Sequence, residues 1–173
     1  STLFPYTTLF RSMGLRGVAQ LAVGQAHACA RVRGDGVWCW GNNRLGQLGD
    51  GTRIARAAPV RVAEPELLDA KWIVAAPGGS HTCALDGRGR LWCWGDNTFG
   101  QVGTGAMATE IPTPTRVVIP MGVEPMERVR LGDSASCALS ETGAVWCWGE
   151  PSVFLPGETV AVRTARRLPW FGR

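Results

Sequence analysis

The tetrapeptide Trp-Cys-Trp-Gly occurs three times in this chain, beginning at Trp38, Trp92 and Trp146 and repeating every 54 residues. Each copy is preceded, ten residues upstream of its own cysteine, by a second cysteine. This motif accounts for all six cysteines, which are Cys29, Cys39, Cys83, Cys93, Cys137 and Cys147. Self-similarity at a fixed period is typical of repeat architectures, in which units bury their apolar faces against their neighbours.

The repeat motifs span about residues 21–51, 75–105 and 129–157. The first two contain Gly-x-x-His-x-x-Ala before the tetrapeptide and Asn-x-x-Gly-Gln-x-Gly after it. The third has Ala135 at the histidine position, and its last seven residues read Pro-Ser-Val-Phe-Leu-Pro-Gly. The repeat positions with an expected structural role are Gly24, His27, Trp38, Trp40, Gly41, Gly78, His81, Trp92, Trp94, Gly95, Gly132, Trp146, Trp148 and Gly149.

The two cysteines of each unit lie symmetrically about a turn that contains glycine, as Cys29 and Cys39 do about Gly34. Glycine supplies the positive φ that a three- or five-residue hairpin loop needs. We therefore expect an antiparallel hairpin in which each cysteine lies opposite its partner. A small local approach of the strands would bring such a pair to bonding distance. Disulfides are favoured, because paired cysteines in every unit indicate an oxidising compartment; buried free thiols are the alternative.

The strand that carries the tetrapeptide is predicted to be buried on both sides. Alternation sends Val37 and Cys39 to one face and Trp38 and Trp40 to the other, and both faces are apolar. Further short apolar runs at 59–62, 72–75, 115–119 and 129–131 complete the units, and no long stretch has helical periodicity. The prediction is an all-β fold of about four antiparallel strands per unit, stacked as blades.

These motifs together resemble the regulator-of-chromosome-condensation repeat family, whose members fold as β-propellers, usually with seven blades. The resemblance covers roughly residues 17–165. The cysteine pairs are similar to those of bacterial members that are secreted or exposed at the cell surface. Three units are too few to close a ring of about four to eight blades, so the resemblance implies a partial propeller, an open arc of a larger one that lacks its other blades. Alternatively, the degenerate third unit is a genuine terminal blade.

The first twelve residues resemble the in-frame translation of a sequencing-library adapter, and we expect residues 1–12 to be an artefact outside the fold. Residues 13–173 are predicted to form a single incomplete propeller domain. The chain is then expected to be a fragment whose true N-terminus lies elsewhere.

No catalytic, cofactor or metal site is predicted. His27 and His81 occupy equivalent repeat positions without a recurring nucleophile or carboxylate beside them, so we expect them to hydrogen-bond between blades. Zinc is disfavoured, because the chain has no Cys-x-x-Cys and only two histidines. The glycine-rich segments 46–51 and 100–105 lack the Gly-Lys-Ser/Thr ending of a phosphate-binding loop and are predicted to be turns.

Charge and hydropathy point to neither nucleic acid nor membrane. The net charge is +4, but its basic residues are scattered instead of concentrated on one face. No apolar run approaches the ~18 residues that suggest a membrane-spanning helix.

The sequence therefore predicts a non-enzymatic interaction scaffold: part of a secreted or surface-exposed propeller that presents rim loops to a protein or another macromolecule. The candidate loops are the variable segments 50–58 and 104–114. Two alternatives follow from the resemblance: a guanine-nucleotide-exchange or chromatin-associated regulator, like the founding member, and a secreted enzyme inhibitor, like the β-lactamase-inhibitor propellers. The fold by itself does not choose among them.

Overall fold

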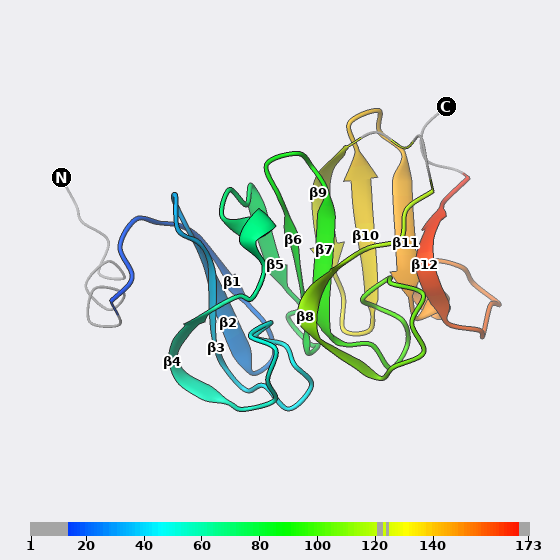
Figure 1. Cartoon of the computed structure of the whole chain (residues 1–173). Helices are drawn as coiled ribbons and strands as arrows, with labels where there is room; N and C mark the ends of the chain where they lie inside the picture. The colour runs from blue at the N-terminus through cyan, green and yellow to red at the C-terminus, as the bar shows by residue number, and fades with distance from the viewer. Residues whose placement is uncertain (1–13, 121–122, 124, 170–173) are drawn as a thin grey trace.

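The computed structural model describes residues 14–120, 123 and 125–169, so the adapter-like residues 1–12 lie outside the described part. Twelve strands form three four-stranded antiparallel sheets, which stand side by side as the blades of a partial propeller (Figure 1). The predicted all-β fold and the arc of three blades are confirmed.

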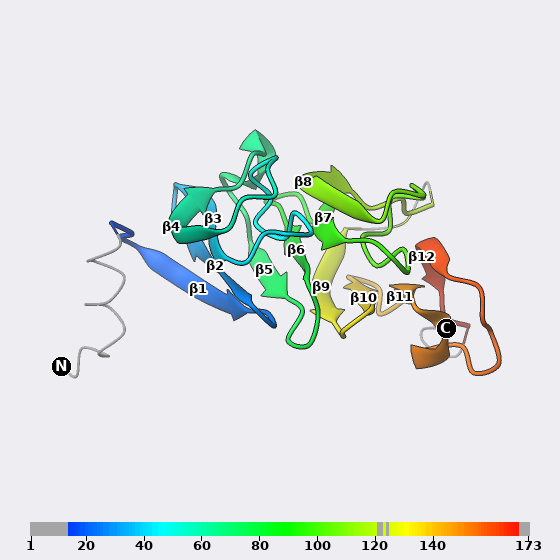
Figure 2. The same cartoon turned by 90° about the horizontal axis from the view of Figure 1, so that it is seen from below.

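Each blade runs from an inner first strand to an outer fourth strand (Figure 2). Blade 1 comprises β1 (Val18–Val23), β2 (His27–Val32), β3 (Gly36–Gly41) and β4 (Arg56–Arg61). Blade 2 comprises β5 (Trp72–Ala75), β6 (His81–Leu85), β7 (Leu91–Asp96) and β8 (Glu110–Arg116). Blade 3 comprises β9 (Met126–Leu131), β10 (Ala135–Ser140), β11 (Val145–Gly149) and β12 (Val162–Arg167). Two short 3-10 helices, η1 (Pro65–Leu67) and η2 (Pro151–Val153), lie in the connections.

The central hairpin of every blade has the predicted register. Cys29 pairs with Cys39, Cys83 with Cys93 and Cys137 with Cys147, and each pair forms a disulfide with its Cα atoms 4.1 Å apart. That spacing is close to the about 4.5 Å of a non-hydrogen-bonded antiparallel pair. The hairpin turns contain glycines of positive φ, among them Gly34 at 71°.

The outer strands differ from the apolar runs that were expected to form them. The run 115–119 overlaps β8 only at Thr115 and Arg116, because β8 begins at Glu110 and includes two prolines. Proline lacks the N–H that an inner strand would use, but an edge strand tolerates it. The apolar alternation that predicts half-buried strands therefore misplaces this one.

The two faces of each blade contact different neighbours. We call the side that carries the disulfide the cystine face, and the side that carries the two tryptophans the tryptophan face. The cystine face of blade 1 packs with Trp92 and Trp94 of blade 2. The cystine face of blade 2 packs in the same way with Trp146 and Trp148 of blade 3. The cysteines of blades 1 and 2 are fully buried, so each of these disulfides lies inside an interface between blades.

All six cysteines should resist alkylation in the unfolded, unreduced chain and react after reduction, because the structure pairs every one of them. Intact mass spectrometry measures the labels directly. The double variant Cys83→Ala/Cys93→Ala should lose about 2–3 kcal/mol of unfolding free energy, the chain-entropy value for so short a loop. Labelling without reductant, or a double variant as stable as the parent, would contradict this assignment.

Candidate interaction surface

A buried polar cluster joins blade 1 to blade 2 around the main-chain carbonyl of Gln47. This oxygen accepts a hydrogen bond from the Trp94 indole N–H at 2.9 Å and another from the Thr82 hydroxyl at 3.1 Å. The Thr82 oxygen also lies 2.8 Å from Nε2 of His27. Because a hydroxyl has one proton and Thr82 donates it to Gln47, Nε2 of His27 must be the donor in this last bond.

The same cluster recurs between blades 2 and 3. The Gln101 carbonyl accepts from the Trp148 indole at 2.7 Å and from the Ser136 hydroxyl at 2.8 Å, and Ser136 lies 3.0 Å from Nε2 of His81. The histidines therefore lie where the sequence led us to expect them, between blades, and neither has a nucleophile beside it. Their arrangement fixes the position of one blade on the next and offers no acid–base chemistry.

Burial keeps both histidines neutral near pH 7. Loss of solvation lowers the pKa of His27 to about 4. The same effect, with a further contribution from charge on His27, lowers the pKa of His81 to about 3. The Nδ1 atoms of both rings are buried without a hydrogen-bond partner, so protonating either ring would place a charge in an apolar interface.

The loops that follow the Trp-Cys-Trp-Gly strands are organised by buried asparagines. Asn43 is fully buried, and its amide N–H groups donate to Asp50 and to the carbonyls of Thr52 and Ile54. Asn97 donates in the same way to the carbonyls of Ala106 and Ala108. Each loop is thus tied to a side chain that repeats at the 54-residue period, and its path is fixed while its surface residues vary.

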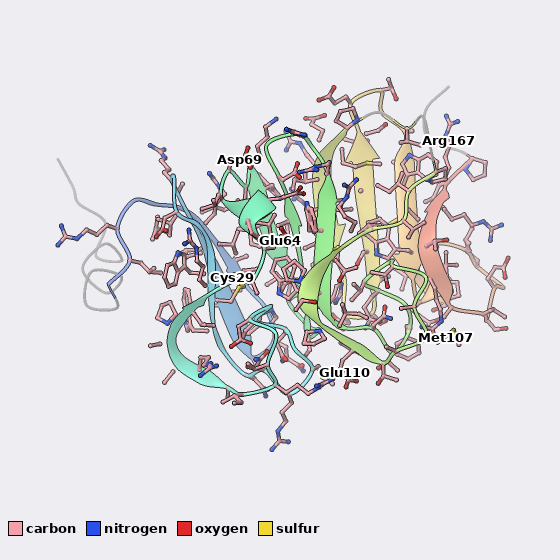
Figure 3. The ribbon with its side chains drawn as sticks, in the orientation of Figure 1. Cys29, Glu64, Asp69, Met107, Glu110 and Arg167 are labelled. Atoms are coloured by element: carbon pink, nitrogen blue, oxygen red, sulfur yellow. A yellow bond between two sulfur atoms is a disulfide. The ribbon has the colours of Figure 1, made fainter. Side chains whose placement is uncertain are left out.

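These loops present large apolar side chains on one rim. Ile54 is 61% exposed, Phe99 42% and Met107 76%. Arg53 and Glu110 form an ion pair at 2.8 Å that joins the loop of blade 1 to the start of β8. Met107 and Glu110 lie along the same edge of the molecule, opposite the hairpin turns (Figure 3). We call these five residues the rim surface; they fall within or beside the predicted segments 50–58 and 104–114.

Electrostatics stiffen the blade 1 loop further. Burial alone would raise the pKa of Asp50, but hydrogen bonds from Thr52, Arg56 and Asn43 outweigh it and lower the pKa below its usual value. Asp50 therefore stays ionised and accepts from Arg56 at 3.1 Å. The rim surface is a rigid platform and not a flexible loop.

The remaining repeat glycines serve close approaches of the backbone. Gly41, Gly95 and Gly149 have φ between 101° and 107°, and a Cβ at each would come within 2.7 Å of a main-chain carbonyl in the preceding loop. At the first glycine position the surroundings differ: a side chain on Gly24 would meet His27, one on Gly78 would meet Asp133, and Gly132 is open. That position is therefore not equally constrained in the three blades.

Two features escaped the sequence analysis. Arg61 and Arg116 lie directly across from Trp38 and Trp92, with each guanidinium within 6 Å of the indole ring. They are 55 residues apart, so the 54-residue period does not align them. The hydroxyls of Thr82 and Ser136 are 54 residues apart, and that period could have identified them as partners of the histidines.

Within the described residues, no group of three or more His, Cys, Asp or Glu side chains is arranged to hold a metal ion. No helix in the same residues is long and apolar enough to span a membrane.

Comparison with known proteins gives consistent matches to one repeat family. Its description, "Regulator of chromosome condensation (RCC1) repeat", matches residues 35–85 and 88–139, and a second pattern of the same description matches 18–47, 73–101 and 128–153. Rat Alsin is 39% identical over 88 residues, which are 50% of this chain and 5% of Alsin.

Two solved structures superimpose on most of this chain. Human WBSCR16 gives a TM-score of 0.75 at 21% identity, covering 88% of this chain and 38% of that one. Yeast RCC1 (Prp20), solved bound to Kap60, gives 0.72 at 25% identity over 88% and 37%. The chain thus spans well under half the length of these similar proteins.

Stability should fall as the pH decreases from 6.5 towards 4. Both histidines have a lower pKa in the folded state than the 6.5 of an unfolded chain, so the unfolded state binds more protons in this window. The loss between pH 6.5 and 4.5 should be roughly 2 kcal/mol for each histidine. Thermal or urea unfolding at a series of pH values measures it.

The variant His81→Ala, which introduces the residue that blade 3 has at 135, provides the control. It should lose about half of the pH dependence above pH 4.5, where the carboxylate of Asp50 does not yet titrate. An unchanged slope would assign the acid sensitivity to other groups.

Proposed function

Because this chain belongs to the regulator-of-chromosome-condensation (RCC1) repeat family, we propose that it is a non-enzymatic interaction scaffold, part of a secreted or surface-exposed propeller. Its partner is a protein or another macromolecule that contacts the rim surface. The observation that carries this proposal is the combination of fixed loops and exposed Ile54, Phe99 and Met107 on one rim.

Contact chemistry supports the rim as the binding side. Apolar side chains exposed together on one face often mark protein-binding sites, and loops held by a rigid scaffold are where binding residues concentrate. The Arg53–Glu110 pair adds a polar element that a partner can recognise. Because Asn43 and Asn97 already order the loops, binding would cost little further loop entropy.

The three disulfides support a location outside the reducing cytosol. Disulfides persist in secreted, periplasmic and cell-surface proteins and are rare where glutathione keeps thiols reduced. This argument favours the bacterial, secreted type of family member over a nuclear one.

Regulation of nucleotide exchange, or association with chromatin, is the second candidate, favoured by the likeness to yeast RCC1 (Prp20). A secreted enzyme inhibitor is the third, and it would also use a rim surface. Measuring nucleotide release from a panel of small GTPases, and inhibition of a panel of secreted hydrolases, separates these candidates from a pure scaffold. Accelerated release would replace our first proposal with the second.

Site-specific photo-crosslinking tests the rim surface directly. A crosslinking residue at Met107 should capture a defined macromolecule from the extracellular fraction of the source organism. The same residue at Leu68, 45% exposed beside η1, is the matched control and should not. The double variant Ile54→Ser/Phe99→Ser should reduce capture from position 107 at least tenfold without changing the melting temperature.

Equal capture from positions 68 and 107 would show that the rim surface has no special role. Capture that the double variant leaves intact would lead to the same conclusion.

A further inference from the structure

In blades 1 and 2, a glycine allows the following blade to approach the loop. A Cβ on Gly46 would lie 2.5 Å from Cα of Pro112, in the outer strand of blade 2. A Cβ on Gly100 would lie 2.9 Å from Cα of Arg163, in the outer strand of blade 3. Contacts this close leave no room for a side chain, so the stacking of another blade depends on glycine at this position.

Blade 3 has Phe154 at this position, two repeats after Gly46. The loop begins as in the other blades, since Phe154 N–H donates to the Pro151 carbonyl as Gly46 N–H donates to that of Asn43. It then diverges, because φ is −136° at Phe154 but 74° at Gly46. Positive φ is unfavourable for a bulky residue, so the backbone takes a different path here.

On this path, Phe154 covers the cystine face of its own blade. It is only 8% exposed and forms a cluster with Ala135, Cys147 and Leu168. Cys147 is 1% exposed although no further blade in the described structure packs on this side. In blades 1 and 2, by contrast, the tryptophans of the following blade belong to the cluster that covers the disulfide. Phe154 thus replaces an intermolecular-type contact with a local one.

The polar partner is missing on the same face. His27 and His81 each reach a hydroxyl of the next blade, whereas blade 3 has Ala135 at this position. Loss of the histidine leaves no buried ring nitrogen that would require a hydroxyl from a following blade. Two independent changes, at 135 and at 154, therefore make the same face self-sufficient.

We propose that residues 150–157 form a cap that blocks the stacking of a further blade on blade 3, with Phe154 as the residue that excludes it. The segment crosses the outside of β11, at the far end of the arc from β1 (Figure 2). The tryptophan face of blade 1, where Trp38 and Trp40 are only half-buried, would otherwise complement this cystine face in a second copy of the chain. The cap prevents such head-to-tail growth, and this inference is independent of the rim surface.

A pair of matched variants of the full chain tests the exclusion. Ala28→Thr/Ala135→His/Phe154→Gly restores on both end faces the residue types that join blades 1 and 2, while Ala28→Thr/Ala135→His keeps the cap. Sedimentation velocity from 1 to 100 µM should detect assemblies of two or more 18.5-kDa chains for the first variant only. Adding Trp40→Arg should abolish them. Assembly of both variants, or of neither, would overturn the proposal.

The protection of individual disulfides gives a readout that does not depend on assembly. In Phe154→Gly, the Cys137–Cys147 bond should be reduced at least fivefold faster than in the parent, and the other two bonds in the same molecule should be unaffected. The control Val153→Gly alters a neighbouring side chain that is 64% exposed and should change none of the three rates. An unchanged rate for Cys137–Cys147 in a folded Phe154→Gly variant would show that Phe154 does not cover this face.

Discussion

The stacking of a cystine face on the tryptophan face of the next blade is the contact on which the structure depends. Each buried tryptophan removes about 150–250 Å² from water, a gross contribution of about 4–6 kcal/mol before the entropy cost of ordering. A disulfide that closes so short a loop contributes about 2–3 kcal/mol. The disulfides therefore fix the register of each hairpin, while burial of the tryptophans holds the blades together. The shared glutamine carbonyl then sets the position of one blade on the next, because only one placement satisfies the indole and the hydroxyl together.

Much of this arrangement could be predicted from the repeat. The period of the tetrapeptide gives three units, the symmetry of the cysteines about a glycine gives the hairpin, and the two apolar faces of residues 37–40 require neighbours on both sides. Other features could not be predicted, because they depend on main-chain atoms or on unequal spacing. The carbonyls of Gln47 and Gln101 leave no signature in side-chain chemistry, and Arg116 departs from the period because the preceding loop is one residue longer. Strand β8 was misplaced because its prolines are tolerated only at an edge.

The repeat also separates the residues that build the scaffold from those available for binding. Histidines, tryptophans and the loop asparagines lie in buried positions, where packing and hydrogen bonding account for them. The exposed apolar residues of the rim surface do not recur identically between blades and are free to differ. The degenerate end of the third repeat belongs with the scaffold, because Phe154 performs locally the covering that a neighbouring blade performs elsewhere.

Native-state hydrogen exchange tests most directly whether contacts between blades, and not the blades themselves, supply the stability. Blade 2 is the one blade in the described structure with another blade packed on both of its faces. We therefore predict that the amides of β6 and β7 exchange most slowly, with protection decreasing towards β2 and β3 on one side and β10 and β11 on the other. Equal protection of the three central hairpins would contradict this account, because it would mean that each disulfide-linked hairpin is stable on its own.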